Sequence, residues 1–135
     1  MLTGSAHGRF TNSTGAAPSE EQLVAFVHRN GPTQTGVMSH VFGLRQKGCE
    51  ARGDCFITKA MCDDPSVKGH SIDHSVTLVG YGTDATHGDY WLVKNSWSTR
   101  FANKGFIKVA RGVSCARIDC CGNVFTYGDP ASYYE

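Results

Sequence analysis

The stretch that decides the fold is residues 73–97, which read DHSVTLVGYGTDATHGDYWLVKNSW. It contains two apolar-rich segments, residues 74–81 and residues 90–97. The residues between them, 82–89, are rich in glycine, threonine and aspartate, which favour chain reversal. The two segments are therefore predicted to form antiparallel strands joined by a hairpin loop.

The register of this hairpin brings a histidine and an asparagine together. Folding about the centre of the loop puts Val79 opposite Leu92 and His74 opposite Trp97. Asn95 then lies one diagonal step from His74 on the same face, because side chains alternate along a strand. An amide oxygen that binds one imidazole nitrogen fixes the tautomer and leaves the other nitrogen to take a proton from a nucleophile. The pair is a candidate catalytic site, and a core histidine beside a structural asparagine is the alternative.

A family resemblance favours the catalytic interpretation. His74-Ser-Val-Thr-Leu-Val-Gly-Tyr-Gly82 followed by Tyr90-Trp-Leu-Val-Lys-Asn-Ser-Trp97 resembles the histidine and asparagine motifs of papain-like cysteine proteases, the cathepsins among them. Both motifs occur in the family's order and at a fitting separation. The resemblance implies that His74 is the general base, that Asn95 orients it, and that Trp97 shields their hydrogen bond from water.

The resemblance also exposes an absence. The sequence contains no Cys-Gly-Ser-Cys-Trp segment, which carries the family's nucleophile, and no upstream oxyanion-binding glutamine motif. We therefore expect the second, His/Asn-bearing domain of a papain-like peptidase, inactive as this chain alone. Its expected partners are a cysteine-bearing first domain or another protein subunit, and a peptide substrate. The alternative is a non-catalytic structural or interaction module that kept the fold and lost the nucleophile.

Composition sets the broad class. With 135 residues at 40% hydrophobic, the chain is predicted to be a single folded domain. A net charge of +1 without blocks of like charge predicts neither a nucleic acid nor an anionic membrane as partner. No apolar run is long enough to span a membrane. Residues 1–10 lack the apolar core of a signal peptide, so we expect Met1 to begin a fragment or a processed piece.

The cysteines indicate the compartment. Six cysteines in a chain this short predict disulfides and an oxidising location, either secreted or lysosome/vacuole-like. Zinc is the competing interpretation, but no Cys-x-x-Cys pair occurs and the histidines are scattered, so no metal is predicted. The proposed chemistry requires no organic cofactor either. Asn12 begins a glycosylation sequon, which predicts a glycoprotein and fits the same compartment.

The family also suggests a disulfide pairing. Its members link a cysteine ahead of the histidine to one in a Cys-Gly near the C-terminus, and Cys62 with Cys121 fits that pattern best. The remaining four cysteines could close as Cys49 with Cys55 and Cys115 with Cys120, one connectivity among many that six cysteines allow.

The rest of the chain completes the predicted domain. Residues 1–18 are predicted to be an extended lead-in segment and residues 19–135 a papain-like C-terminal domain. Ser19 and Gln22 form a capping box that begins a helix, and Gly31-Pro32 ends it. The resemblance extends over about residues 10–127. The predicted class is α+β, mostly β, with an antiparallel barrel-like sheet and one peripheral helix.

Residues 33–41 are predicted to form the next strand, which in the family helps line the pocket for the second residue before the scissile bond. By that resemblance Gly36, Ile72 and Ser75 form the pocket, and a glycine there leaves room for a bulky side chain. An ordinary strand position is the alternative for Gly36.

The segment after Asn95 departs from the family, and a further strand is predicted at residues 105–110. The family usually has glycine, tryptophan and glycine where this chain has Ser98, Phe101 and Ala102. If the two glycine positions require positive φ, each replacement costs about 1 kcal/mol. This departure favours a divergent member.

Overall fold

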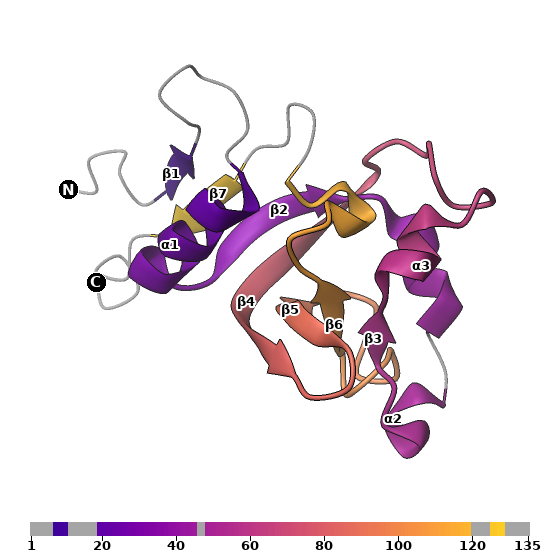
Figure 1. Ribbon diagram of the computed structural model, residues 1–135. Coiled ribbons are helices and arrows are strands. Elements are labelled where there is room, and N and C mark those ends of the chain that lie inside the picture. The colour runs from indigo at the N-terminus through magenta and orange to yellow at the C-terminus, as the bar shows by residue number, and fades with distance from the viewer. Residues whose placement is uncertain (1–6, 11–18, 46–47, 120–124, 129–135) are drawn as a thin grey trace.

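A computed structural model of the protein describes residues 7–10, 19–45, 48–119 and 125–128. One long, curved sheet runs through it (Figure 1), with a helix against one end and shorter helices near the other. The predicted class, mixed α and β with sheet dominating, is confirmed.

The sheet contains seven described strands: β1 His7–Phe10, β2 Thr33–Val37, β3 Phe56–Ile57, β4 His74–Asp84, β5 Gly88–Lys94, β6 Phe106–Ala110 and β7 Phe125–Gly128. The described helices are α1 Glu20–Asn30, α2 Cys49–Arg52 and α3 Lys59–Asp63, with the 3-10 helices η1 Ser39–Arg45 and η2 Cys115–Arg117. The strand predicted for residues 33–41 therefore ends at Val37, and a helical segment follows it.

The sheet is open, so the predicted barrel-like closure is wrong. Its strand order is β1-β7-β2-β4-β5-β6-β3, with β1 and β3 at the two ends and no pairing between them. Among the described ladders only β3 with β6 is parallel. β3 has two residues and pairs with β6, and among the described strands no ladder joins β3 to β1.

Helix α1 begins and ends where the sequence predicts. The Ser19 side chain accepts from the backbone N–H of Gln22, and the Gln22 side chain accepts from the Ser19 N–H. Gly31 ends the helix with φ at 80°, in the region that favours glycine. Leu23 and Val27 are buried against the sheet, so the helix is held by its apolar stripe as well as by its caps.

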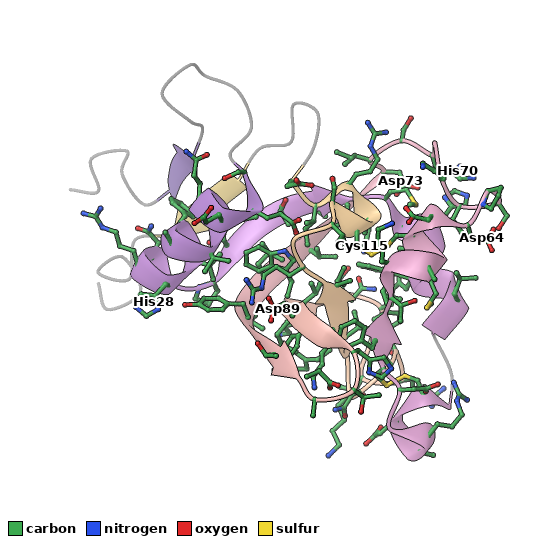
Figure 2. The ribbon with its side chains drawn as sticks, in the orientation of Figure 1. His28, Asp64, His70, Asp73, Asp89 and Cys115 are labelled. Atoms are coloured by element: carbon green, nitrogen blue, oxygen red, sulfur yellow. A yellow bond between two sulfur atoms is a disulfide. The ribbon has the colours of Figure 1, made fainter. Side chains whose placement is uncertain are left out.

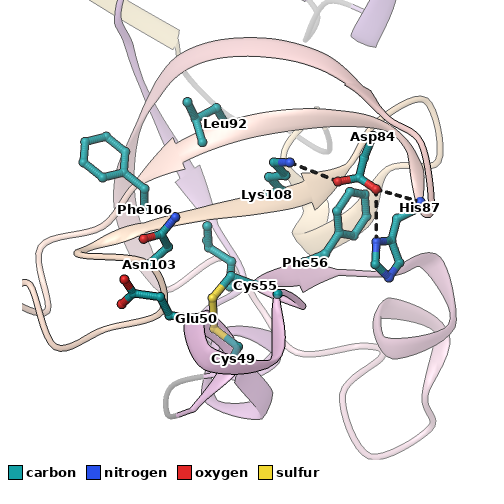
Figure 3. Close-up of a pocket in the computed structure, with 12 residues that line it drawn as sticks. Cys49, Glu50, Cys55, Phe56, Asp84, His87, Leu92, Asn103, Phe106 and Lys108 are labelled. Atoms are coloured by element: carbon teal, nitrogen blue, oxygen red, sulfur yellow. Dashed lines mark hydrogen bonds and ion pairs between the residues drawn. A yellow bond between two sulfur atoms is a disulfide. The ribbon is translucent and has the colours of Figure 1, made fainter.

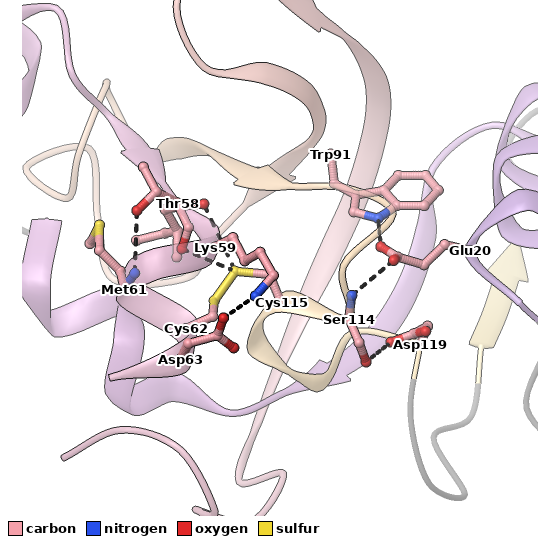
Figure 4. The surroundings of a disulfide bond; sticks show 11 residues. Glu20, Thr58, Lys59, Met61, Cys62, Asp63, Trp91, Ser114, Cys115 and Asp119 are labelled. Atoms are coloured by element: carbon pink, nitrogen blue, oxygen red, sulfur yellow. Dashed lines mark hydrogen bonds and ion pairs between the residues drawn. A yellow bond between two sulfur atoms is a disulfide. The ribbon is translucent and has the colours of Figure 1, made fainter. Parts of the chain in front are cut away.

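A buried carboxylate joins α1 to the sheet (Figure 4). One oxygen of Glu20 accepts from the indole Nε1 of Trp91 at 2.8 Å, and the other accepts from the Ser114 N–H at 3.0 Å. Glu20 is 8% exposed and Trp91 is fully buried. Both carboxylate oxygens are thus satisfied, which is what burial of such a group requires.

β4 and β5 form the predicted hairpin, with a bulge in the ladder. Leu78 pairs with Val93. This pair follows the predicted register, which therefore holds on the side of the bulge that is farther from the turn. Beyond Leu78 the register shifts by one residue, so Gly80 instead of Val79 lies opposite Leu92. A bulge places an extra residue on one strand and increases the local twist, which is why simple folding about the loop centre gave the wrong partner for Val79.

The hairpin turn is tighter than predicted, with residues 85–87 between the strands. Asp84 accepts the backbone N–H groups of Thr86 and His87, and its other oxygen accepts from Lys108 Nζ at 3.0 Å. The Lys108 bond, followed by the two backbone bonds, holds the pKa of Asp84 well below its usual range.

Two disulfides occur among the described cysteines. Cys49 is bonded to Cys55, as predicted. Cys62 is bonded to Cys115, so the predicted Cys62–Cys121 bond is wrong (Figure 4).

The wrong pairing has a local cause. Ala116, which follows Cys115, has φ at 56°, so it adopts a conformation that usually belongs to glycine. The family's Cys-Gly pattern therefore pointed to Cys121, although the actual partner of Cys62 is Cys115, which is followed by an alanine. The predicted Cys115–Cys120 bond is excluded by the same disulfide, while Cys120 and Cys121 themselves lie outside the described residues.

None of the described helices combines the length and the apolar composition that a membrane-crossing segment needs.

Candidate active site

The predicted contact between His74 and Asn95 is present. His74 Nε2 lies 2.7 Å from Asn95 Oδ1, and the Ser96 N–H donates to the same oxygen at 2.7 Å. Because an amide oxygen only accepts, Nε2 carries the proton in this bond. Nδ1 is then the nitrogen that can accept a proton. His74 is half-buried at the start of β4, and Asn95, which follows β5, is 6% exposed.

Trp97 lies beside this hydrogen bond. Its ring centroid is 5.0 Å from that of His74, with 30° between the ring planes. The indole is partly buried and packs against the hydrophobic core. An apolar ring at this distance excludes water from one side of the imidazole, so the geometry predicted for Trp97 is also present.

Two phenylalanines support Trp97, and the sequence prediction missed one of them. Phe101 meets the indole edge-on at 5.3 Å, and Phe42 of η1 does so at 6.3 Å. Both are buried, at 3% and 0% exposure. Edge-to-face contacts at these separations are favourable and fix ring orientation. The adjacent apolar residues Val41 and Phe42 were the available sequence signal.

Asp73 anchors the start of β4. Its Oδ1 accepts from the Ser39 N–H at 2.9 Å, and its own N–H donates to the Val37 carbonyl at 3.1 Å. The Ser39 bond, with smaller contributions from His40 and His74, holds the pKa of Asp73 below its usual range. Asp73, labelled in Figure 2, thus links the first residue of η1 to the residue before His74. The carboxylate therefore fixes the chain immediately before His74.

The amide nitrogen of Asn95 is buried and has no hydrogen-bond partner among the described residues. Leaving a buried donor unsatisfied costs about 1–3 kcal/mol. The backbone is nevertheless tied on both sides, because the Asn95 N–H donates to the Gly105 carbonyl at 2.9 Å. The side chain of Asn95 thus keeps its oxygen on His74, while its amide nitrogen has no acceptor among the described residues.

The segment after Asn95 has the backbone conformations that the resemblance suggested. Ser98 has φ at 73° and Ala102 has φ at 46°, so both positions expected to favour glycine do adopt positive φ. Lys104 is a third such residue, with φ at 53°. Non-glycine residues in this region store backbone strain, and such strain concentrates at functional sites.

Two of the three predicted pocket residues lie together. Gly36 and Ser75 are direct partners in the β2–β4 ladder, on the face that the core does not cover. The Gln34 amide donates to the Ser75 hydroxyl at 2.7 Å, which makes this face more polar than predicted. Ile72 is half-buried just before β4. Their role in binding substrate stays a prediction.

The described part of the chain offers no free thiol, because Cys49, Cys55, Cys62 and Cys115 all form disulfides. The predicted glycosylation site, Asn12, lies outside the described residues. A nucleophile for His74 is therefore not among the described cysteines.

Comparisons with known proteins identify a family for the chain. Residues 5–123 match the papain family of cysteine proteases. A cathepsin L-like protein of Caenorhabditis elegans is 39% identical over 94 residues, and cathepsin S of Rattus norvegicus is 40% identical over 95 residues. Each alignment covers 68% of this chain and 24% of the relative. The chain thus spans about a quarter of the length of these relatives.

Solved structures show the same likeness. The bromelain protease from Ananas comosus, in complex with the E64 inhibitor, superposes with a TM-score of 0.65 at 25% identity. That match covers 92% of this chain and 49% of the bromelain chain. The digestive procathepsin L2 proteinase from Tenebrio molitor larval midgut gives the same TM-score over 33% of its chain. By sequence and by fold, the chain belongs to the papain family of cysteine proteases.

Proposed function

We propose that this chain is the His/Asn-bearing C-terminal half of a papain-like cysteine peptidase, with residues 19–135 as its domain. The observation that carries the proposal is the 2.7 Å contact between His74 Nε2 and Asn95 Oδ1 beside Trp97. A histidine with one nitrogen held by an amide oxygen and the other available is the arrangement that a general base needs.

The chemistry follows from that arrangement. A cysteine on a separate first domain would face His74 Nδ1 across a cleft, and the imidazole would take the thiol proton. The resulting thiolate attacks a peptide carbonyl, and the imidazolium then protonates the leaving amine. Water releases the acyl group from the cysteine with the same histidine as base. Asn95 keeps the ring in one orientation throughout.

The partners and the location belong to the same proposal. The cysteine-bearing domain or subunit docks on the face that carries His74, and a peptide binds between the two domains. Gly36, Ile72 and Ser75 are proposed to contact the second residue before the scissile bond. The two disulfides fit an oxidising compartment, and we propose secretion or a lysosome/vacuole-like compartment.

A non-catalytic scaffold is the second candidate. The missing nucleophilic cysteine and the changed residues Ser98, Phe101 and Ala102 favour it, because they depart from the family's usual sequence. The intact trio of His74, Asn95 and Trp97 favours the enzyme, since a scaffold gains nothing from an orphaned buried amide donor beside a shielded histidine.

Reconstitution distinguishes the two. The chain alone should not react with a thiol-directed peptide inhibitor. Mixed with a separately produced, cysteine-bearing first domain of a papain-like peptidase, it should restore labelling of that cysteine, as measured by mass spectrometry. His74→Ala should abolish the recovery while the domains still bind, because the thiol then has no base within reach. His28→Ala, which alters an exposed histidine of α1, is the control and should leave recovery intact.

Each outcome has one meaning. Labelling of the isolated chain at one of its own cysteines contradicts the proposed mechanism. Binding without recovered labelling favours the scaffold.

A further inference from the structure

A pocket whose lining does not include His74 lies between the Cys49–Cys55 disulfide and strands β4, β5 and β6 (Figure 3). Its volume is about 150 Å³. Sites for drug-sized molecules are about 300–1,000 Å³, so this pocket is suited to a single side chain. The sequence prediction treated this part of the chain only as tied-down loops.

The walls of the pocket are held in place before any ligand arrives. The Cys49–Cys55 bond closes a loop of a few residues, and the Asp54 N–H donates to the Cys49 carbonyl at 2.9 Å. The opposite wall is β6, whose Lys108 N–H donates to the Cys55 carbonyl at 3.1 Å. A covalently and hydrogen-bonded frame reduces the entropy that binding would otherwise cost.

The polar groups at the hairpin end of the pocket are already paired. Asp84 binds Lys108 and the hairpin backbone, and the ring of His87 stacks on Phe56 with 4.7 Å between centroids. A ligand at this end would have to break existing bonds. Recognition must therefore come from elsewhere in the pocket.

The other end has unused polar groups. Neither the Glu50 carboxylate nor the Asn103 side-chain amide has a hydrogen-bond or ion-pair partner among the described residues, and both line the pocket. Between the two ends the lining is apolar, with Leu92, Phe106 and the disulfide. Because Lys108 offsets the charge of Asp84, the uncompensated charge of the lining is that of Glu50.

We propose that this pocket binds an arginine side chain presented by a partner polypeptide. The planar guanidinium matches a carboxylate in two hydrogen bonds and stacks on aromatic rings, as Glu50 and Phe106 would allow. Its alkyl stem packs on Leu92 and the disulfide, and Asn103 Oδ1 takes a further N–H. Arg100 lines the neighbouring groove together with Glu50, so its guanidinium would compete with an incoming arginine for that carboxylate.

Titration of the ¹⁵N-labelled 135-residue chain with N-acetyl-arginine N-methylamide tests the proposal. The backbone amides of Gly53, Asn103 and Lys108 should shift and saturate, with a dissociation constant on the order of 1 mM for one side chain. Glu50→Gln should weaken binding about two- to fivefold, which is the range for an exposed ion pair. Arg100→Ala should strengthen it. The citrulline analogue, which has the same shape without the charge, should bind more weakly than the arginine compound.

The matched control is Glu21→Gln, which removes an exposed carboxylate of α1 and should leave the affinity unchanged. Unsaturated or absent shifts at the three pocket amides overturn the proposal. Equal binding of the citrulline compound, or equal loss of affinity in Glu50→Gln and Glu21→Gln, overturns it as well. None of these results depends on whether His74 is catalytic.

Discussion

The start of α1 and the segment after Asn95 obey local rules to different degrees. At the start of α1 the capping box and the first-turn carboxylates agree with the observed helix, and Gly31 ends that helix where the sequence predicts. After Asn95, three residues with side chains adopt positive φ, and the asparagine leaves a buried donor unpaired. Local agreement marks a structural element, whereas local conflict held in place by surrounding contacts is typical of a functional site.

The largest effect is expected on the α1 side. Glu20→Ala should lower the free energy of unfolding by about 2–4 kcal/mol, because it leaves the Trp91 indole N–H and the Ser114 N–H without acceptors. Chemical denaturation measures this. Glu21→Ala, one position along on the exposed face, should change stability by less than about 0.5 kcal/mol. Equal losses in the two variants would mean that the buried carboxylate has no special role.

Phe42→Leu tests whether Phe42 holds Trp97 beside the His74–Asn95 pair. The variant should lose about 1–2 kcal/mol of stability, since it replaces an aromatic contact in a fully buried position. The solvent exchange of the His74 ring N–H, followed by NMR, should accelerate about threefold or more as the indole loosens. Phe56→Leu, a buried phenylalanine in β3, should cost similar stability and leave that exchange unchanged. Equal acceleration in both would show only a general loosening.

Relief of backbone strain should stabilise the segment after Asn95. Ser98→Gly should raise the free energy of unfolding by about 1 kcal/mol, because glycine adopts positive φ without steric cost. Ala102→Gly should gain less, since it also removes a buried methyl group. Ser71→Gly, at an exposed position without positive φ, should not stabilise. If Ser98→Gly behaves like Ser71→Gly, the strain assigned to this segment is absent.

The hairpin turn makes the free energy of unfolding depend on pH. Because the folded-state pKa of Asp84 is lowered, chiefly by Lys108, the carboxylate stabilises the fold above its unfolded pKa of about 3.9, and this contribution fades as the pH falls. Asp84→Asn should therefore be less stable than the parent at neutral pH, with a difference that narrows below about pH 4. Lys108→Met should reduce that pH dependence. A constant difference across the acid range would contradict the role of Asp84.

Sequence reasoning predicted the parts of the fold that local chemistry determines. The caps of α1 and the meeting of His74 with Asn95 followed from turn residues and strand alternation. The bulge at Val79 was not predictable, because it depends on how the ladder accommodates twist over its whole length. Sheet closure was also overpredicted, since closure depends on edge pairing between distant strands.

Sequence reasoning also failed to predict contacts between residues that are far apart in the chain. Cys115 was overlooked as the partner of Cys62 because an alanine takes the left-handed position where the family pattern expects glycine. Phe42 was overlooked because the apolar pair Val41-Phe42 indicates burial but does not indicate that η1 packs on Trp97. In both cases tertiary contacts hold a conformation that the local sequence does not favour.

The most direct test of the central claim is the ¹⁵N spectrum of the His74 ring at a pH where the ring is neutral. With Asn95 Oδ1 as acceptor, the proton should reside on Nε2, and that N–H should exchange slowly with water. In Asn95→Ala the two tautomers should mix and exchange should quicken. A proton on Nδ1 in the parent chain, or a spectrum that Asn95→Ala leaves unchanged, would contradict the assignment of His74 as a base oriented by Asn95.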